Sequence, residues 1–277
     1  MTLRIGVLGP TGFGGSYLCF ELLQRGLAVR GLSRRPEKLG SHEKYTPHPI
    51  DIESASLEEL IEAFKDLDVL VNEYGPHTAG ENALKYRPFL ELTRKIVIAA
   101  KEAKLRYRRS IADSHAHVSY MEERLGSMGT SLRAYRNARR RLRSDQADEA
   151  SLKLIEDYET VVMNNDQALE FVTASRTSYM FFDGNTSFKW TYVSPPALYR
   201  SGKRTGAYET IIDELPVKPA PKGTDASSLD GRLHGISVAD LAIAIADEVE
   251  NKKLAGKHWS AFADMSDDIP TPSYITI

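Results

Sequence analysis

Residues 3–15, Leu-Arg-Ile-Gly-Val-Leu-Gly-Pro-Thr-Gly-Phe-Gly-Gly, join a short apolar run to a glycine-rich turn. The apolar run predicts a strand, and the leucines within residues 16–25 recur at helical spacing. A strand, a glycine-rich turn and a helix together form the first unit of a dinucleotide-binding fold. The spacing is G-x-x-G-x-x-G rather than G-x-G-x-x-G, so an ordinary glycine-rich turn remains the alternative interpretation.

The three spaced glycines of this turn have separate physical roles. Gly9 permits the tight turn, Gly12 lets a pyrophosphate approach the backbone, and Gly15 lets the helix pack close to the strand. The helix N-terminus then presents free N–H groups and the positive end of its dipole to phosphates. The turn therefore predicts nucleotide binding.

The composition is that of a soluble globular protein. The chain has 277 residues, of which 42% are hydrophobic and 27% charged, and a formal net charge of −2, which argues against general nucleic-acid binding. No apolar run approaches the roughly 20 residues that a membrane span needs, and no secretory signal precedes the first strand. Cys19 is the single cysteine, so no internal disulfide is expected. We therefore expect a cytoplasmic protein.

Strand and helix patterns alternate along most of the chain. This alternation predicts an α/β protein with a doubly wound parallel sheet, a Rossmann fold. We expect one domain over residues 1–277, with a charged insertion at 131–150 and a substrate-side region at 177–235 that forms a small C-terminal lobe; within it, 197–235 is expected to be loop. The patterns predict strands over 28–32, 68–72, 106–112, 188–193 and 258–262, another ending at 50–52, and helices over 57–64, 87–104, 151–175 and 238–250, with Ser56 and Ser237 as N-caps.

The residues after the second predicted strand bear on cofactor choice. In this fold that strand ends beside the adenosine ribose, where an acidic residue selects NAD and an arginine accommodates the 2′-phosphate of NADP. Here Ser33 is followed by Arg34 and Arg35 and by no acid, which favours NADP(H) over a merely solvated basic turn. The segment from Asn72 to residue 77 ends another strand and is expected to border the same cofactor.

The segment Asp113–His117 carries the most reactive set of side chains. It follows the fifth predicted strand, where a substrate carbonyl would lie against a nicotinamide. We expect Ser114 to hydrogen-bond that carbonyl and His115 or His117 to transfer a proton; the alternative is a polar loop with no chemical role. No metal site is expected, because two histidines at i, i+2 lack a third ligand.

Several segments resemble one family. Residues 6–12, Gly-Val-Leu-Gly-Pro-Thr-Gly, residues 33–38, Ser-Arg-Arg-Pro-Glu-Lys, and residues 190–198, Trp-Thr-Tyr-Val-Ser-Pro-Pro-Ala-Leu, are similar to NmrA-like, NAD(P)H-binding atypical short-chain dehydrogenases. The resemblance implies contacts of Gly9, Thr11, Gly12, Phe13 and Gly15 with the phosphates, of Arg34 with the 2′-phosphate, of Asp51 with the adenine side, and of Pro195 and Pro196 with the nicotinamide end.

The chain departs from the Tyr-x-x-x-Lys pair that classical relatives of this family use. Only Tyr199 and Lys203 have the spacing, and Gly202 disfavours the helix that would place them on one face. We therefore predict that their spacing is accidental.

These observations favour an NADPH-dependent oxidoreductase acting on a small organic carbonyl or conjugated alkene. A regulator that senses NADP without turnover is one alternative, supported by the arginine-rich residues 133–143. A non-redox isomerase or cyclase is another, with aromatic residues at 177–188 shaping an apolar pocket. The sequence leaves the substrate and the oligomeric state open, with a homodimer as one option.

Overall fold

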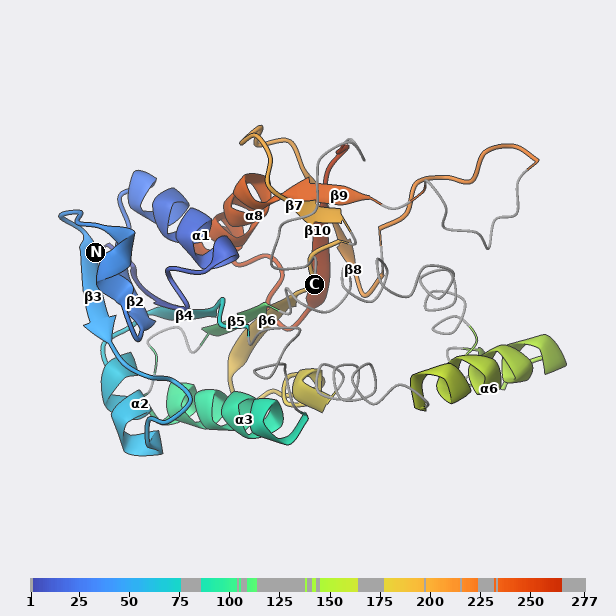
Figure 1. Cartoon of the computed structure of the whole chain (residues 1–277), viewed down its shortest axis with the longest axis horizontal. Helices are drawn as coiled ribbons and strands as arrows, with labels where there is room; N and C mark the ends of the chain where they lie inside the picture. Colours follow the sequence, from blue (N-terminus) through green and yellow to red (C-terminus); the bar gives the residue numbers. More distant parts are fainter. Residues whose placement is uncertain are drawn as a thin grey trace.

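The computed structural model describes residues 2–75, 86–103, 105, 109–113, 138, 141–142, 145–163, 177–196, 198–214, 216–223, 232 and 234–265. Their centre is an eight-stranded sheet with helices on both faces (Figure 1). All the strand pairs are parallel except the last, where β8 runs antiparallel to β10, so the predicted doubly wound α/β class is confirmed. In spatial order the strands are β3 (Tyr45–Pro49), β2 (Ala28–Ser33), β1 (Arg4–Leu8), β4 (Val69–Asn72), β5 (Arg109–Asp113), β6 (Lys189–Val193), β10 (His258–Phe262) and β8 (Glu209–Ile212).

Two pairs of helices cover the two faces of the sheet (Figure 1). On one face α1 (Phe13–Gln24) packs against α8 (Val238–Asn251), and their apolar side chains share a core with β1, β2, β4 and β10. On the other face α2 (Leu57–Phe64) packs against α3 (Tyr86–Glu102) over a second core. The alternation of strand and helix thus buries both faces of the parallel strands, as this architecture requires.

The two predicted N-caps are confirmed. Ser56 accepts a hydrogen bond from the Glu59 amide at 3.1 Å, and the Glu59 carboxylate accepts one from the Ser56 amide at 2.7 Å, which completes a capping box on α2. Ser237 accepts a hydrogen bond from the Asp240 amide at 3.0 Å at the start of α8. Both side chains satisfy amides that the first helical turn leaves without a backbone partner.

Two sequence predictions are wrong in detail. The third strand ends at Pro49, not at residues 50–52, and it contains two prolines. The sheet tolerates them because β3 is an edge strand, bonded to β2 alone. The region 197–235 is not simply loop: it holds β8 and β7 (Leu198–Arg200), and β7 pairs with β9 (Gly235–Ser237) in a second, two-stranded sheet.

The aromatic residues at 177–188 form a packed cluster. Phe182, Phe188, Trp190 and Tyr192 are all at most 7% exposed and pack with Val97 of α3. The Phe182 ring meets Phe188 and Trp190 edge-on, with centroids 6.0 and 5.9 Å apart, and meets Tyr192 at a tilt, with centroids 5.4 Å apart. In the described part of the chain these rings therefore anchor α3 and β6 to each other.

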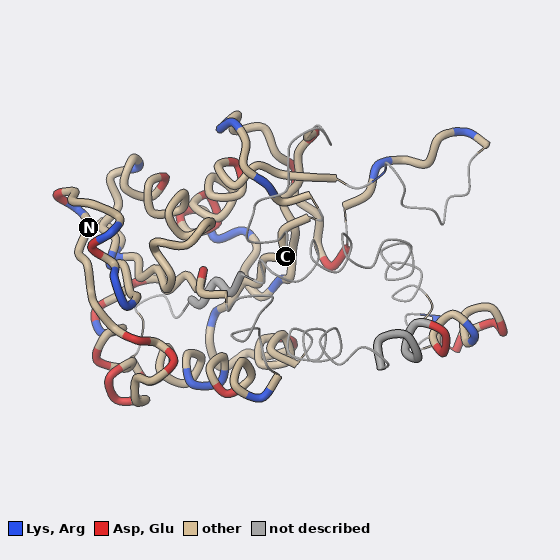
Figure 2. Tube along the Cα trace, viewed as in Figure 1, with Lys and Arg blue, Asp and Glu red and all other residues tan. Residues whose placement is uncertain are grey.

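The helix α6 (Glu149–Met163) begins at the end of the charged segment 131–150 and lies beyond the sheet at one end of the molecule (Figure 1). Most of the arginine-rich residues 133–143 lie outside the described residues. Arg141 contacts the Asp148 carboxylate at 3.8 Å, with both side chains more than half exposed. Figure 2 shows acidic and basic residues interspersed along this helix. Among the helices that the structure describes, none combines the length and apolar character of a membrane span.

Candidate functional site

The glycine-rich turn folds back on itself between β1 and α1. Gly9 has φ +75°, and its amide donates to the Leu32 carbonyl at 3.0 Å. A Cβ on Gly9 would lie 3.0 Å from the Glu73 carbonyl oxygen, and one on Gly15 would lie 2.1 Å from the Gly9 carbonyl oxygen. Both positions therefore require glycine, Gly9 for its left-handed conformation and Gly15 for the close approach of helix and turn.

The N-terminus of α1 is built to receive an anion. Gly12 is its N-cap, is exposed, and brings no side chain to cap the helix. A Cβ on Gly12 would meet only the Gly9 carbonyl oxygen, at 3.3 Å. Thr11 beside it is also exposed, and the first turn, which begins at Phe13, contains no acidic residue. A pyrophosphate fits this cradle, because it can approach the helix amides and the positive dipole end without displacing a side chain.

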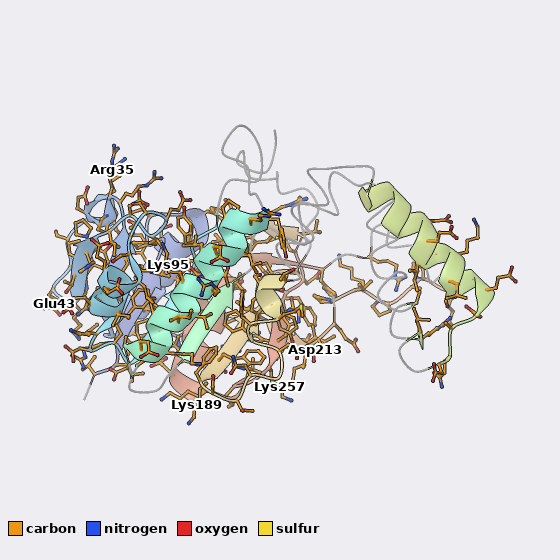
Figure 3. The ribbon with its side chains drawn as sticks, turned by 90° about the horizontal axis from the view of Figure 1, so that it is seen from below. Arg35, Glu43, Lys95, Lys189, Asp213 and Lys257 are labelled. Carbon is orange, nitrogen blue, oxygen red and sulfur yellow. The ribbon has the colours of Figure 1, made fainter. Side chains whose placement is uncertain are left out.

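Basic side chains follow β2 next to this cradle. Arg34 and Arg35 are exposed, and Figure 3 shows Arg35 extending from the end of the molecule that holds β2. Ser33, which ends β2, has a buried hydroxyl with no hydrogen-bond partner among the described residues. The carboxyl end of β2 thus offers two cations and one polar group to a ligand.

Two carboxylates lie at the same end of the sheet: Asp51, which the sequence analysis named, and Glu53, which it missed. The Tyr74 hydroxyl donates a hydrogen bond to the Glu53 carboxylate. Burial is the main cause that raises the pKa of the Tyr74 phenol above its usual range, and this hydrogen bond is the second cause. The charge of Arg34 lowers the pKa of the same phenol, and the charge of Asp51 raises it. Figure 2 shows acidic residues around the start of α2 and basic residues near β2 and β3. The adenosine end of the candidate site is therefore mixed in charge.

Asp51 and Asn72 help to shape this end. The Asp51 carboxylate accepts a hydrogen bond from the Glu53 amide at 3.2 Å, and the Asn72 side-chain oxygen accepts one from the Tyr74 amide at 3.3 Å. Each residue thus fixes the backbone just past the end of its strand. A turn residue that bonds two positions ahead is the signal by which the sequence could have found Glu53. Tyr74 already lies within the segment from Asn72 to residue 77 that the sequence placed beside the cofactor.

The other end of the site lies past β5 and β6. Pro195 and Pro196 are buried directly after β6, and the ladder pairs Asp113 of β5 with Val193 of β6. The assignment of proton transfer to the segment after β5 stays a prediction, because its three residues lie outside the described part of the chain: Ser114, His115 and His117.

Tyr199 and Lys203 do not share a helical face. Tyr199 is 2% exposed in β7, where its ring meets Phe13 edge-on with centroids 5.4 Å apart. Lys203 is exposed in the loop that follows. The two residues thus lie in a strand and a loop rather than on one helix, and the accidental origin of their spacing stays a prediction.

Comparison with known proteins gives a consistent picture. Residues 9–153 match the protein family described as NAD(P)H-binding. The Bacillus subtilis (strain 168) protein YwnB is 23% identical over 267 residues, covering 95% of this chain and 99% of its own length. A solved structure of a candidate epimerase from Bacteroides thetaiotaomicron has a TM-score of 0.63 at 22% identity, covering 96% of this chain and 99% of its own. The oxidoreductase ylbE of Lactococcus lactis has a TM-score of 0.60 at 15% identity, covering 95% and 93%.

Proposed function

The chain belongs to the NAD(P)H-binding family, and on that premise we propose that it is an NADPH-dependent oxidoreductase acting on a small organic carbonyl or conjugated alkene. The observation that carries the proposal is the glycine cradle at the start of α1, where Gly12 leaves the first helical turn open to a pyrophosphate. In this assignment Gly9, Thr11, Gly12, Phe13 and Gly15 hold the phosphates. The bound nicotinamide would supply a hydride.

The preference for NADPH rests on Arg34 and Arg35. Both side chains are exposed just past β2, where the ribose 2′-phosphate of NADP lies in this fold. A guanidinium forms charge-assisted hydrogen bonds with phosphate, typically the stronger kind. The carboxylates of Asp51 and Glu53 lie nearby and would repel the 2′-phosphate. The preference for NADPH therefore depends on the balance between the two arginines and these two carboxylates.

Proton transfer to the substrate is assigned to the carboxyl edge of the sheet beyond β5 and β6. Ser114 would orient the substrate oxygen, and His115 or His117 would supply the proton, as the sequence suggests. Pro195 and Asn72 would border the nicotinamide and the ribose beside it. A non-redox isomerase or cyclase is the second candidate, favoured by the likeness to a candidate epimerase.

The cofactor assignment is tested by fluorescence titration with NADPH and NADH. We expect tighter binding of NADPH, and Arg34→Ala should remove most of the difference, about 1.5–3 kcal/mol for a charge-assisted contact. Arg94→Ala on α3, a half-exposed arginine paired with Glu91, is the matched control and should change neither affinity. Equal affinities in the unmodified protein would contradict the NADPH preference.

The reaction class is tested by following NADPH oxidation with a panel of aldehydes, ketones and enones. Oxidation that depends on the substrate supports the oxidoreductase. Isomerisation of a compound without net NADPH oxidation would replace it with the non-redox candidate.

A further inference from the structure

Three polar side chains from three adjacent strands meet at the opposite end of the sheet from Arg35. Ser194 follows β6, His258 begins β10, and Asp213 follows β8. The Ser194 Oγ lies 2.8 Å from His258 Nε2, and an Asp213 carboxylate oxygen lies 3.5 Å from His258 Nδ1. The imidazole thus bridges a hydroxyl and a carboxylate through its two nitrogens. Figure 3 labels Asp213 at this end and Arg35 at the other.

The backbone ladder fixes this arrangement. The Ser194 amide donates to the Trp259 carbonyl at 2.9 Å, which extends the β6–β10 pairing by one residue. The Asp213 amide donates to the His258 carbonyl at 3.1 Å, which does the same for the β8–β10 pairing. The three residues are therefore held together by the sheet itself, not by rotamer choice alone.

Two tyrosine rings flank His258, and its side chain is partly exposed to solvent. Its ring is flanked by Tyr179 and Tyr192, with centroids 5.1 and 5.5 Å away. Burial is the main cause that raises the pKa of Tyr179 to about 12, and the nearby Asp183, Asp213 and Tyr192 raise it further. The Tyr179 phenol therefore stays neutral near pH 7. The side chain of His258 is 24% exposed and that of Asp213 is 60% exposed. The group is thus exposed at Asp213 and partly buried at His258 and Ser194.

Ser194 is the member nearest the candidate substrate region. It precedes Pro195 at the carboxyl edge of β6, and ligands bind outside the carboxyl ends of such sheets. Ser260 lies two residues after His258 and so faces the same side of β10. Ser260 is 4% exposed, and its hydroxyl has no hydrogen-bond partner among the described residues. A buried hydroxyl without a hydrogen-bond partner is destabilising, so this residue on the same side of β10 as His258 is a second sign of a polar ligand.

A serine, a histidine and an aspartate in this order also occur in hydrolases, but the backbone here suits another role. Serine hydrolases stabilise an oxyanion with the backbone N–H of the residue after the nucleophile or of the nucleophile itself. Pro195 has no N–H, and the Ser194 amide is bonded to Trp259. Neither amide is free to hold an oxyanion, which favours proton transfer over acyl transfer.

We propose that Ser194, His258 and Asp213 form a proton relay that protonates the substrate oxygen in the reaction proposed above, in place of His115 or His117 as the proton donor. The proposal rests on that function. As the carbonyl carbon accepts the hydride, the C=O π electron pair moves to oxygen and takes the Ser194 Oγ proton. The electron pair of that O–H bond stays on Oγ, which takes the Nε2 proton of protonated His258 and leaves a neutral imidazole. Water at the exposed side of the ring, beside Asp213, returns a proton to it.

The three residues have different roles in this relay. Ser194 is the catalytic residue, because its hydroxyl meets the reacting oxygen. His258 and Asp213 are positioning residues that act through Ser194. Since the relay begins from the protonated imidazole, the rate falls as pH rises through the pKa of His258. The Asp213 carboxylate stabilises the protonated imidazole, so neutralising Asp213 moves the decrease in rate to lower pH.

The first test is independent of turnover. Histidines are labelled with ¹³C, the His258 signal is assigned by its loss in His258→Asn, and its titration is followed by NMR in the free protein. We expect Asp213→Asn to shift the His258 titration to lower pH and Ser194→Ala to change it. Asp66→Asn is the matched control, because Asp66 and Asp213 are both exposed and both left-handed, with φ +64° and +56°, a conformation that asparagine tolerates. An unchanged titration in both relay variants overturns the proposal, whether or not a substrate is found.

The second test uses the whole protein with NADPH and a reducible substrate. Ser194→Ala should lower kcat by about 10²–10⁴-fold with unchanged NADPH affinity, the usual contribution of a general acid. Ser194→Thr, which keeps a hydroxyl, should restore most of the activity, and Asp213→Asn should move the alkaline limb of the kcat profile to lower pH. If the unmodified protein is active and Ser194→Ala lowers kcat by less than about threefold, the relay is overturned. The oxidoreductase proposal is then unaffected, and the proton donor is again sought in residues 114–117. If no substrate in the panel is reduced by NADPH, the proposed function is overturned instead, and the NMR titration alone then decides whether the relay exists.

Discussion

At the scale of single residues, two glycines of the same turn have opposite tolerances. A Cβ on Gly15 would lie 2.1 Å from the Gly9 carbonyl oxygen, whereas one on Gly12 would meet a single atom at 3.3 Å. Gly12 also has φ −74°, which any residue can adopt. The fold therefore demands glycine at position 15, while position 12 admits a Cβ with a small shift of the Gly9 carbonyl and is otherwise constrained by what approaches the helix N-terminus.

A pair of variants tests this difference. Gly12→Val should remain folded but lose NADPH binding, because its methyl groups occupy the path of the pyrophosphate. Gly15→Ala should lower the free energy of unfolding by about 1–3 kcal/mol or more, the cost of overpacking a close contact. Thermal unfolding and NADPH fluorescence separate the two effects. Retained NADPH binding in a folded Gly12→Val protein would refute the placement of the phosphates.

Glu53 gives a second prediction at this scale. Its carboxylate accepts the Tyr74 hydrogen bond at the end of the sheet where Arg34 acts on the same phenol. Glu53→Gln keeps the shape and removes a negative charge, so the preference for NADPH over NADH should rise about two- to fivefold, the size of an exposed charge interaction. Tyr74→Phe, which keeps that charge, is the control. A preference that falls in Glu53→Gln would show that Glu53 does not face the 2′-phosphate.

At the scale of elements, the two capped helices depend on their caps to different degrees. Ser237 is 4% exposed, accepts from the Asp240 amide and donates to the Lys203 carbonyl at 2.9 Å. Asp240 in turn accepts from the Thr205 amide and hydroxyl, both at 2.7 Å. The start of α8 thus fixes the loop between β7 and β8, whereas Ser56 caps α2 at the surface.

Ser237→Ala should therefore destabilise the protein more than Ser56→Ala. We expect about 2 kcal/mol for Ser237→Ala, at the upper end of cap losses, and about 1 kcal/mol for Ser56→Ala. Urea unfolding of the two variants measures both values under the same conditions. Equal losses would mean that the bond from Ser237 to the loop contributes nothing.

Local signals in the sequence predicted the elements that depend on local chemistry. The bounds of α2 and both N-caps follow from a serine, a following acid and helical spacing, and the structure has them at the expected positions. The bounds of β3 do not follow, because prolines in a strand are acceptable only at an edge, and an edge is a property of the assembled sheet. The short strands β7 and β8 escaped prediction for the same reason, since pairing with β9 and β10 defines them.

At the scale of the whole molecule, strand order brings together residues that the sequence separates. The phosphate turn could be predicted because its glycines are neighbours in the chain. Ser194, Asp213 and His258 could not, because they meet only when β10 inserts between β6 and β8. Glu53 and Tyr74 meet for a similar reason, across the loops that follow β3 and β4. Sequence patterns thus identify a site built on one turn and miss sites assembled across strands.

An ion network joins the two halves of the chain across one face of the sheet. Glu21 of α1 accepts hydrogen bonds from Arg25 at 2.8 Å and from Arg204 at 2.9 and 3.0 Å. Arg25 also contacts Asp247 of α8 at 2.7 Å. Burial alone would raise the pKa of Glu21, but the hydrogen bonds from Arg204 and Arg25 outweigh it and hold this pKa below its usual value of 4.5. The network therefore links α1, α8 and the loop after β7 through one buried carboxylate.

The pH dependence of stability tests this network. Because the pKa of Glu21 is lower in the folded than in the unfolded state, its contribution is complete above about pH 4.5 and declines as pH falls toward the folded-state pKa. Glu21→Gln should lose about 1–3 kcal/mol at pH 7, less than a fully enclosed ion pair because the Arg204 side chain is 54% exposed. The difference in the free energy of unfolding between the unmodified protein and Glu21→Gln should then narrow below about pH 4.5.

Glu62→Gln, which removes a 70% exposed partner of Lys65, is the control and should cost under about 0.5 kcal/mol at any pH. A gap between the unmodified protein and Glu21→Gln that stays constant from pH 7 to pH 3, measured by chemical unfolding, would show that Glu21 titrates alike in both states and that the network does not hold the two halves together.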